Sequence, residues 1–122
     1  MYTFFQRSAP HPSLVVFDAP DASSTCTRRV RSNTPLQALT QLNDEGAAEL
    51  ANALADRIRK YTPEGDAAGI RFGYLIALNR EPRAEESGRI GRFLAVQRDA
   101  GRDPYRAFAR VLLNLDEFLT RP

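Results

Sequence analysis

Signals that start a helix recur along this chain, and they constrain its fold more than any other feature of the sequence. Asn33-Thr34-Pro35 and Asp103-Pro104 each place an oxygen-bearing side chain directly before a proline. Such side chains accept hydrogen bonds from the amides of a first helical turn. Proline suits the first helical position, because its φ is already helical and it has no N–H to leave unpaired. Both positions therefore predict the start of a helix.

Apolar residues spaced three and four positions apart predict about five short amphipathic helices. Short connections between them favour antiparallel packing of neighbours. Within the second helix, the expected inward stripe is Ala47, Leu50, Leu54, Ile58 and Tyr61. The expected helices cover about 35–43, 45–61, 66–78, 83–99 and 104–113, and a last turn covers 116–119. The fold class predicted is therefore all-α, a compact antiparallel bundle.

Stop signals agree with these helix ends. Asn79 tolerates the left-handed conformation better than most residues other than glycine, and Pro82 follows it. Gly101 is placed to end the next helix. Phe118 and Leu119 lie in the last turn, where we expect them to fix the C-terminus by packing on the helices.

The first 32 residues differ from the rest, because Pro10, Pro12 and Pro20 rule out a long helix there. The run 13–17 (SLVVF) is short and β-capable. We expect extended chain and turns over 1–32 and a helical body over 33–122. The interpretation is one domain, 1–122, that forms the C-terminal part of a larger multidomain protein.

Composition excludes several kinds of chemistry. Cys26 is the only cysteine and His11 the only histidine, so the chain alone cannot form an internal disulfide, a multi-Cys or multi-His metal site, or a His-paired nucleophile. No Gly-x-Gly loop or CxxCH motif occurs, and no apolar run approaches the length that spans a bilayer. The start at Met1 lacks the pattern of a signal peptide. We predict no catalytic, cofactor-binding or metal-binding residues in this chain.

One polar stretch has the character of an anion site. Three arginines precede the first strong helix start, and both guanidinium groups and helix N-termini attract anions. Nearby acids could instead pair with these arginines inside the domain, which is the simpler interpretation. An acidic or sulfated glycan and nucleic-acid phosphate are the other candidates, although no aromatic platform interleaves with the cluster and the net charge is only +2. The candidate residues are Asp18, Asp21, Arg28, Arg29, Arg31, Asn33 and Thr34.

These segments resemble a known family, the C-terminal domain of unknown function in planctomycete cytochrome c-associated proteins. The resemblance is carried by 2–7 (YTFFQR), 10–12 (PHP), 17–21 (FDAPD), Cys26, 28–39 (RRVRSNTPLQAL), 42–44 (LND) and 111–119 (VLLNLDEFL). It implies an exported, extracytoplasmic protein whose upstream region carries an export signal and a c-type haem segment. Haem c would then belong to that upstream region, and the upstream domains would be the partners of this chain.

The leading functional hypothesis is a non-catalytic helical packing and interaction module that docks those upstream domains. One alternative is a composite glycan-processing site, to which Asp18, Arg28, Arg31 and Asn33 contribute. Another is weak nucleic-acid binding through Arg28, Arg29 and Arg31, which the near-balanced charge makes unlikely. The sparse catalytic inventory favours a non-enzymatic role for the chain on its own.

Overall fold

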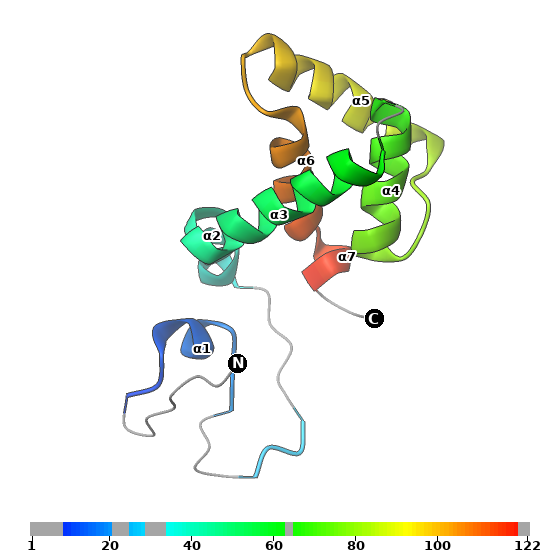
Figure 1. Cartoon of the computed structure of the whole chain (residues 1–122). Coiled ribbons are helices and arrows are strands. Elements are labelled where there is room, and N and C mark those ends of the chain that lie inside the picture. Colours follow the sequence, from blue (N-terminus) through cyan, green and yellow to red (C-terminus); the bar gives the residue numbers. More distant parts are fainter. Residues whose placement is uncertain (1–8, 21–24, 29–33, 63–64, 120–122) are drawn as a thin grey trace. The chain divides into compact units, whose positions relative to one another are not determined.

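The computed structural model describes residues 9–20, 25–28, 34–62 and 65–119, and over these residues it contains helices and no strand (Figure 1). The predicted all-helical fold is confirmed, and α2 to α6 are the five principal helices. The helices are α1 (Pro12–Val16), α2 (Pro35–Asn43), α3 (Glu45–Tyr61), α4 (Asp66–Leu78), α5 (Ala84–Asp99), α6 (Pro104–Leu113) and α7 (Asp116–Leu119). None of these described helices has the length and apolar character needed to cross a membrane.

The chain divides into two compact units, Met1–Thr40 and Gln41–Pro122. We call them the N-terminal unit and the helical unit. The division falls within α2, eight residues after the boundary that the composition suggested at 32/33. Each unit is described by itself below.

Helix caps in the structure follow the sequence signals closely. The Asp44 carboxylate accepts a hydrogen bond from the backbone N–H of Ala47 at 3.1 Å and so caps α3. Asp103 caps α6 by accepting from the N–H groups of Tyr105 and Arg106. Asn79 ends α4 with a φ of 55°, in the left-handed region predicted for it. These caps satisfy amides and carbonyls that a helix end leaves unpaired.

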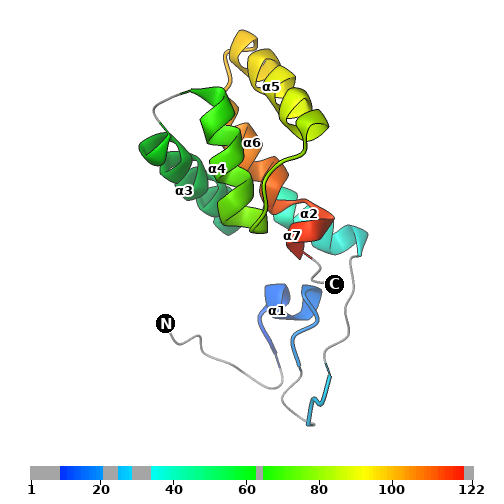
Figure 2. The ribbon, with the colours of Figure 1, turned by 90° about the vertical axis from the view of Figure 1, so that its right-hand side faces the viewer.

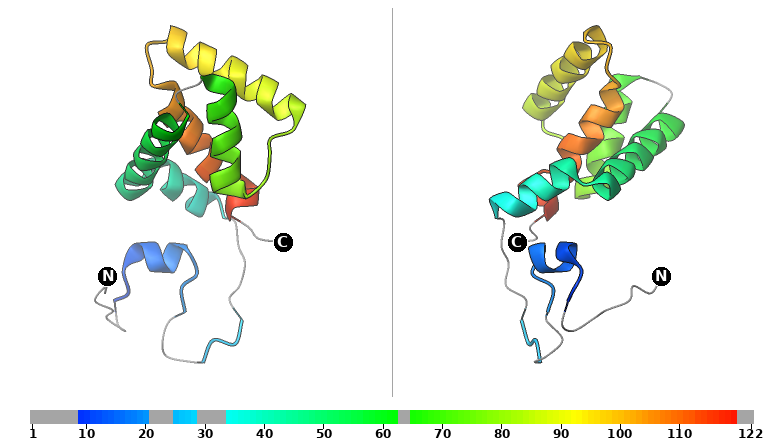
Figure 3. Two further views of the ribbon diagram at one scale, coloured as in Figure 1. Left: turned by 45° about the vertical axis from the view of Figure 1, so that its right-hand side comes forward. Right: turned by 90° about the vertical axis from the view of Figure 1, so that its left-hand side faces the viewer.

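The core of the helical unit lies where α3, α4, α5 and α6 meet. Helix α6 packs against the other three, and α4 and α6 lie between α3 and α5 (Figures 2 and 3). Four large side chains at its centre are almost inaccessible to solvent, one from α3, one from α5 and two from α6. The buried cluster consists of Ile58, Ile70, Tyr74, Ile90, Leu94, Phe108 and Leu112.

The buried face of α3 differs from the predicted stripe. Ala51 and Ala55 are 1% exposed and pack with Ala109 of α6, whereas Leu50 is 66% exposed. Tyr61 is 60% exposed, Leu54 is half-buried, and Ile58 is the fully buried member of the predicted set. Small alanines let α3 and α6 approach closely, and this close contact outweighs the bulk of the leucine that lies one position earlier.

Close approach also explains two glycines of α4. A Cβ atom at Gly73 would lie 2.7 Å from Cε1 of Phe108, and one at Gly69 would lie 2.8 Å from Cε1 of Tyr105. Helix α4 can therefore pack on the aromatic side chains of α6 only because these positions carry no side chain.

The run 13–17 forms most of a short helix, α1, instead of the extended segment that we predicted. His11 caps this helix, because its Nδ1 accepts a hydrogen bond from the N–H of Ser13 at 3.3 Å. Pro12 occupies the first helical position, as Pro35 and Pro104 do in α2 and α6. Five residues are too few to show helical periodicity, so β-propensity misled the prediction there.

The last turn also differs from the prediction in one respect. Phe118 is 42% exposed and does not anchor the C-terminal turn α7. Leu115, which lies just before this turn, packs against the core instead. Glu117 attaches the turn to the helical unit through an ion pair with Arg80, described below.

Candidate functional site

The predicted anion site is only partly visible. Asp18, Arg28 and Thr34 are among the described residues, whereas Asp21, Arg29, Arg31 and Asn33 lie outside them. Arg28 is exposed, and so is Cys26. Pairing of the arginines with the two acids therefore stays a prediction, as do the glycan and nucleic-acid alternatives.

The structure does bring Asp18 and Thr34 together, through a residue that the sequence prediction did not single out. Gln37 is 6% exposed, and its Nε2 donates to Oδ2 of Asp18 at 3.1 Å and to the carbonyl oxygen of Val16 at 2.9 Å. Its Oε1 accepts from the N–H of Thr34 at 3.0 Å, while its own N–H donates to Oγ1 of Thr34 at 3.3 Å. Gln37 thus connects the end of α1 to the start of α2.

A recognisable signal for this arrangement was present in the sequence. Thr34-Pro35-Leu36-Gln37 has the spacing of a capping box, in which the cap residue and the third helical residue each satisfy the other's backbone N–H. The spare amide hydrogens of Gln37 then reach Asp18, whose φ of 52° belongs to a tight turn. This geometry fixes the backbone and offers no open donor to an anion.

A second polar cluster lies in the helical unit, at Arg80. Its guanidinium group makes paired hydrogen bonds to Glu86 of α5, both at 2.8 Å, and to Glu117 of α7, at 2.7 and 2.8 Å. It also lies over the ring of Tyr74, 5.1 Å from the ring centroid. Arg80 can reach all three because Asn79 turns the chain at the end of α4.

Charges in the Arg80 cluster stabilise one another. Arg80 donates to Glu86, as does the backbone N–H of Arg83, and together they lower the pKa of Glu86 to about 2. Hydrogen bonding to Arg80 also lowers the pKa of Glu117, and the two carboxylates raise the pKa of Arg80. Both carboxylates are therefore ionised at neutral pH and cannot serve as general acids there.

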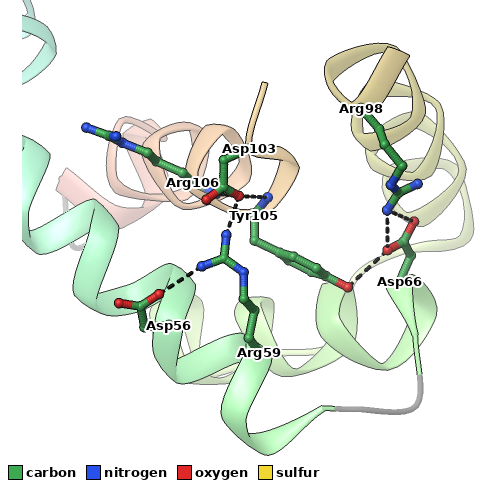
Figure 4. A network of polar contacts seen from close by, with 7 residues as sticks. All are labelled: Asp56, Arg59, Asp66, Arg98, Asp103, Tyr105 and Arg106. Atoms are coloured by element: carbon green, nitrogen blue, oxygen red, sulfur yellow. Dashed lines mark hydrogen bonds and ion pairs between the residues drawn. The ribbon is translucent and has the colours of Figure 1, made fainter. Parts of the chain in front are cut away.

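A third cluster joins helix ends in the helical unit (Figure 4). The Asp66 carboxylate, at the start of α4, accepts from the Tyr105 hydroxyl at 3.0 Å and from Nη2 of Arg98 at 3.0 Å. The Asp103 cap is paired with Arg59, which also contacts Asp56. The figure shows these contacts together with Arg106, whose N–H donates to Asp103.

The pKa values in this third cluster follow from the same contacts. Burial alone would raise the pKa of Asp103, yet this pKa is lowered because Arg59 and the capping amides stabilise the carboxylate. Burial and the hydrogen bond to Asp66 raise the pKa of the Tyr105 phenol. Because these ion pairs are substantially exposed, each contributes little to stability, and we interpret the cluster as a set of helix-end ties.

Among the described residues, no group of three or more histidine, cysteine, aspartate or glutamate side chains could hold a metal ion. One protein-family model matches residues 1–94, that of PSD1, a protein of unknown function (DUF1553). The chain belongs to the PSD1 family. Membership confirms the predicted likeness to a domain of unknown function, and PSD1 carries no assigned activity in that description.

The PSD1 match covers α1 to α4 and most of α5, including both Gln37 and Arg80. It ends before 111–119, so the likeness of that tail to the end of the domain stays a prediction. No curated protein and no solved structure matches the chain.

Proposed function

We propose that this PSD1 chain is a non-catalytic helical interaction module whose N-terminal unit docks on an upstream domain of the same protein. One observation carries the proposal: in the described part of this unit, the buried side chain is a polar one, Gln37, while the large apolar side chains are exposed. Their exposures are 59% for Val15, 38% for Phe17, 58% for Leu36 and 56% for Leu39.

Such a burial pattern is costly for a unit that stands by itself. Removing apolar surface from water stabilises a structure by roughly 25 cal/mol per Å², and the exposed apolar side chains of this unit do not gain that term. Leu36 and Leu39 lie three positions apart in α2, so they project from the same side of the helix. Exposed apolar groups of this kind commonly mark protein contacts.

Charge indicates what the partner surface is like. Neither α1 (PSLVV) nor α2 (PLQALTQLN) contains a charged residue. A charged partner surface would lose its hydration on contact and find no opposite charge in return, which is unfavourable. The fitting partner is an uncharged, apolar protein surface.

The wider setting of the proposal rests on the resemblance to planctomycete cytochrome c-associated proteins. In that setting the chain works outside the cytoplasm, next to upstream domains that include a c-type haem segment. The described residues of this chain contribute to docking and not to haem chemistry.

The test is calorimetric titration of the chain with the upstream region encoded in the same reading frame, produced as a separate polypeptide. The double variant Leu36→Glu/Leu39→Glu should weaken binding by at least about tenfold, since it places two charges in the apolar contact. Leu50→Glu is the matched control, because Leu50 is an equally exposed leucine in the helical unit. It should change the affinity by less than about twofold.

Three results would contradict the proposal. The first is no binding of the upstream region, and the second is an equal loss of affinity in the Leu50→Glu control. The third is self-association of the unmodified chain in light scattering that the double variant abolishes, which would assign this surface to a second copy.

A further inference from the structure

A cavity of about 380 Å³ lies beside Arg80 in the helical unit, remote from the docking residues proposed above. Its size falls within the range of small-molecule sites, roughly 300–1,000 Å³. Part of its wall is apolar and consists of Ile90 of α5, Val111 of α6 and Leu115. The rest of the wall is polar and is formed by Tyr74, Arg80, Glu86, Arg89, Asp116 and Glu117.

Tyr74 supplies the first sign of a ligand. Its side chain is 4% exposed, yet its hydroxyl makes no hydrogen bond within the part of the chain that the structure describes. Burial raises the pKa of this phenol, and the charges that act on it come from four groups, three of which line the cavity together with Arg89. The hydroxyl therefore lies at the polar side of the cavity. Buried hydroxyl groups nearly always have a partner, so this one calls for a ligand atom.

Arg89 supplies the second sign. Over the described residues it makes no ion pair, although Arg80 beside it is fully engaged by Glu86 and Glu117. A guanidinium group carries five N–H donors and binds a carboxylate bidentately. Of the two cations in the cavity wall, Arg89 is the one with capacity for an anionic group of a ligand.

The acidic side of the wall limits the ligand in another way. Each carboxylate oxygen of Glu117 accepts one hydrogen bond from Arg80 and retains a lone pair, and its side chain is 46% exposed. The wall contains three carboxylates against two guanidinium groups. A purely anionic ligand would be repelled by this excess, and a purely cationic one would lie next to Arg89. A ligand with both charges fits better than either.

We propose that this cavity binds a zwitterionic small molecule with an aliphatic body, of the class of free α-amino acids with branched apolar side chains. The ligand carboxylate binds Arg89 and the Tyr74 hydroxyl, and the ammonium group binds Glu117. The aliphatic body contacts the apolar wall described above.

The test is a titration of the isotope-labelled chain with L-leucine, followed by amide chemical shifts. Saturable shifts should concentrate at residues that line the cavity. Two probes of the same shape separate the charges: 3-methylbutanoate keeps only the carboxylate, and 3-methylbutylamine keeps only the ammonium group. Each should bind about tenfold more weakly than leucine, because each loses one charge-assisted contact.

Two variants assign the contacts. Tyr74→Phe keeps the ring that packs on Phe108, so the fold is retained while leucine affinity should fall about fivefold with the lost hydroxyl contact. Arg89→Gln should weaken leucine and 3-methylbutanoate about tenfold and leave 3-methylbutylamine unchanged or tighter. Arg92→Gln is the matched control, an exposed arginine on the same helix outside the cavity wall, and it should have no effect.

The proposal is overturned if cavity residues show no saturable shift up to about 50 mM leucine, a concentration that would reveal even very weak binding. It is also overturned if 3-methylbutanoate binds as tightly as leucine, or if Arg92→Gln weakens binding as much as Arg89→Gln. None of these outcomes bears on docking by the N-terminal unit, so the two proposals fail separately.

Discussion

The two units of this chain bury different kinds of side chain. The helical unit has a core of aliphatic and aromatic residues, four of them almost inaccessible to solvent, assembled from α3 to α6. In the described part of the N-terminal unit, the buried residue is Gln37, and the connection between α1 and α2 consists of hydrogen bonds. One unit is organised by apolar packing and the other by a polar hub.

This difference has an energetic consequence. Burial of apolar surface is the main favourable term in folding, whereas an intramolecular hydrogen bond contributes only about 0.5–1.5 kcal/mol net. We therefore expect the helical unit to dominate the measured free energy of unfolding. The N-terminal unit should open at lower free energy.

The largest expected effect tests the helical side of the comparison. Phe108 of α6 is 0% exposed and contacts Tyr74, so Phe108→Ala should lower the free energy of unfolding by about 3–5 kcal/mol. Leu36→Ala in the N-terminal unit should change it by less than about 0.5 kcal/mol, because Leu36 is already 58% exposed. Urea unfolding followed by circular dichroism measures both. Equal losses would show that the two units share one core.

A smaller effect sharpens the polar side of the comparison, and the two glutamines of α2 provide a matched pair. Gln37→Leu removes both links to the end of α1 and leaves the Val16 carbonyl without its donor. The opening free energy of this unit should fall by about 1–3 kcal/mol. Gln41 has a buried Oε1 with no partner among the described residues, so Gln41→Leu should be neutral or stabilising by up to about 1 kcal/mol.

Hydrogen exchange of backbone amides in α1 and α2 measures this contrast directly. The comparison would fail if Gln37→Leu left exchange in α1 unchanged, or if Gln41→Leu accelerated exchange as much as Gln37→Leu.

Much of the fold was predictable because helix ends are local. The caps at Asp44 and Asp103, the stop at Asn79 and all five principal helices depend on residues within a few positions of one another. The buried face of α3 was not predictable in this way. Its alanine row wins through contact with Ala109, which is more than fifty positions away in the sequence.

The sites were harder to predict for the same reason. The capping box at Thr34 and Gln37 is visible in the sequence, but the second use of Gln37, on Val16 and Asp18, depends on how α1 folds back. The Arg80 cluster joins Glu86 and Glu117, which are six and thirty-seven positions away. Glu86 was interpreted only as a favourable charge in a first helical turn, and nothing local in the sequence indicated its second role.

The smallest effect concerns pH and again belongs to the helical unit. Arg80 holds the pKa of Glu86 at about 2, below its ordinary value of 4.5, and lowers the pKa of Glu117. A carboxylate with a depressed folded-state pKa stabilises the fold above its unfolded-state pKa and loses this contribution as the pH falls through the folded-state value. The contribution should therefore be complete above about pH 4.5 and disappear towards pH 2. Because these side chains are 29% and 46% exposed, we expect only about 1 kcal/mol in total.

Arg80→Gln isolates this contribution from that of other acids, such as Asp103, whose pKa is also lowered. Between about pH 5.5 and pH 3, the unmodified chain should lose about 1 kcal/mol more unfolding free energy than the variant. Urea titrations at the two pH values measure the difference. If both proteins lost the same amount, the Arg80 cluster would be fully screened by solvent, and the advantage of the helical unit would reside in apolar packing alone.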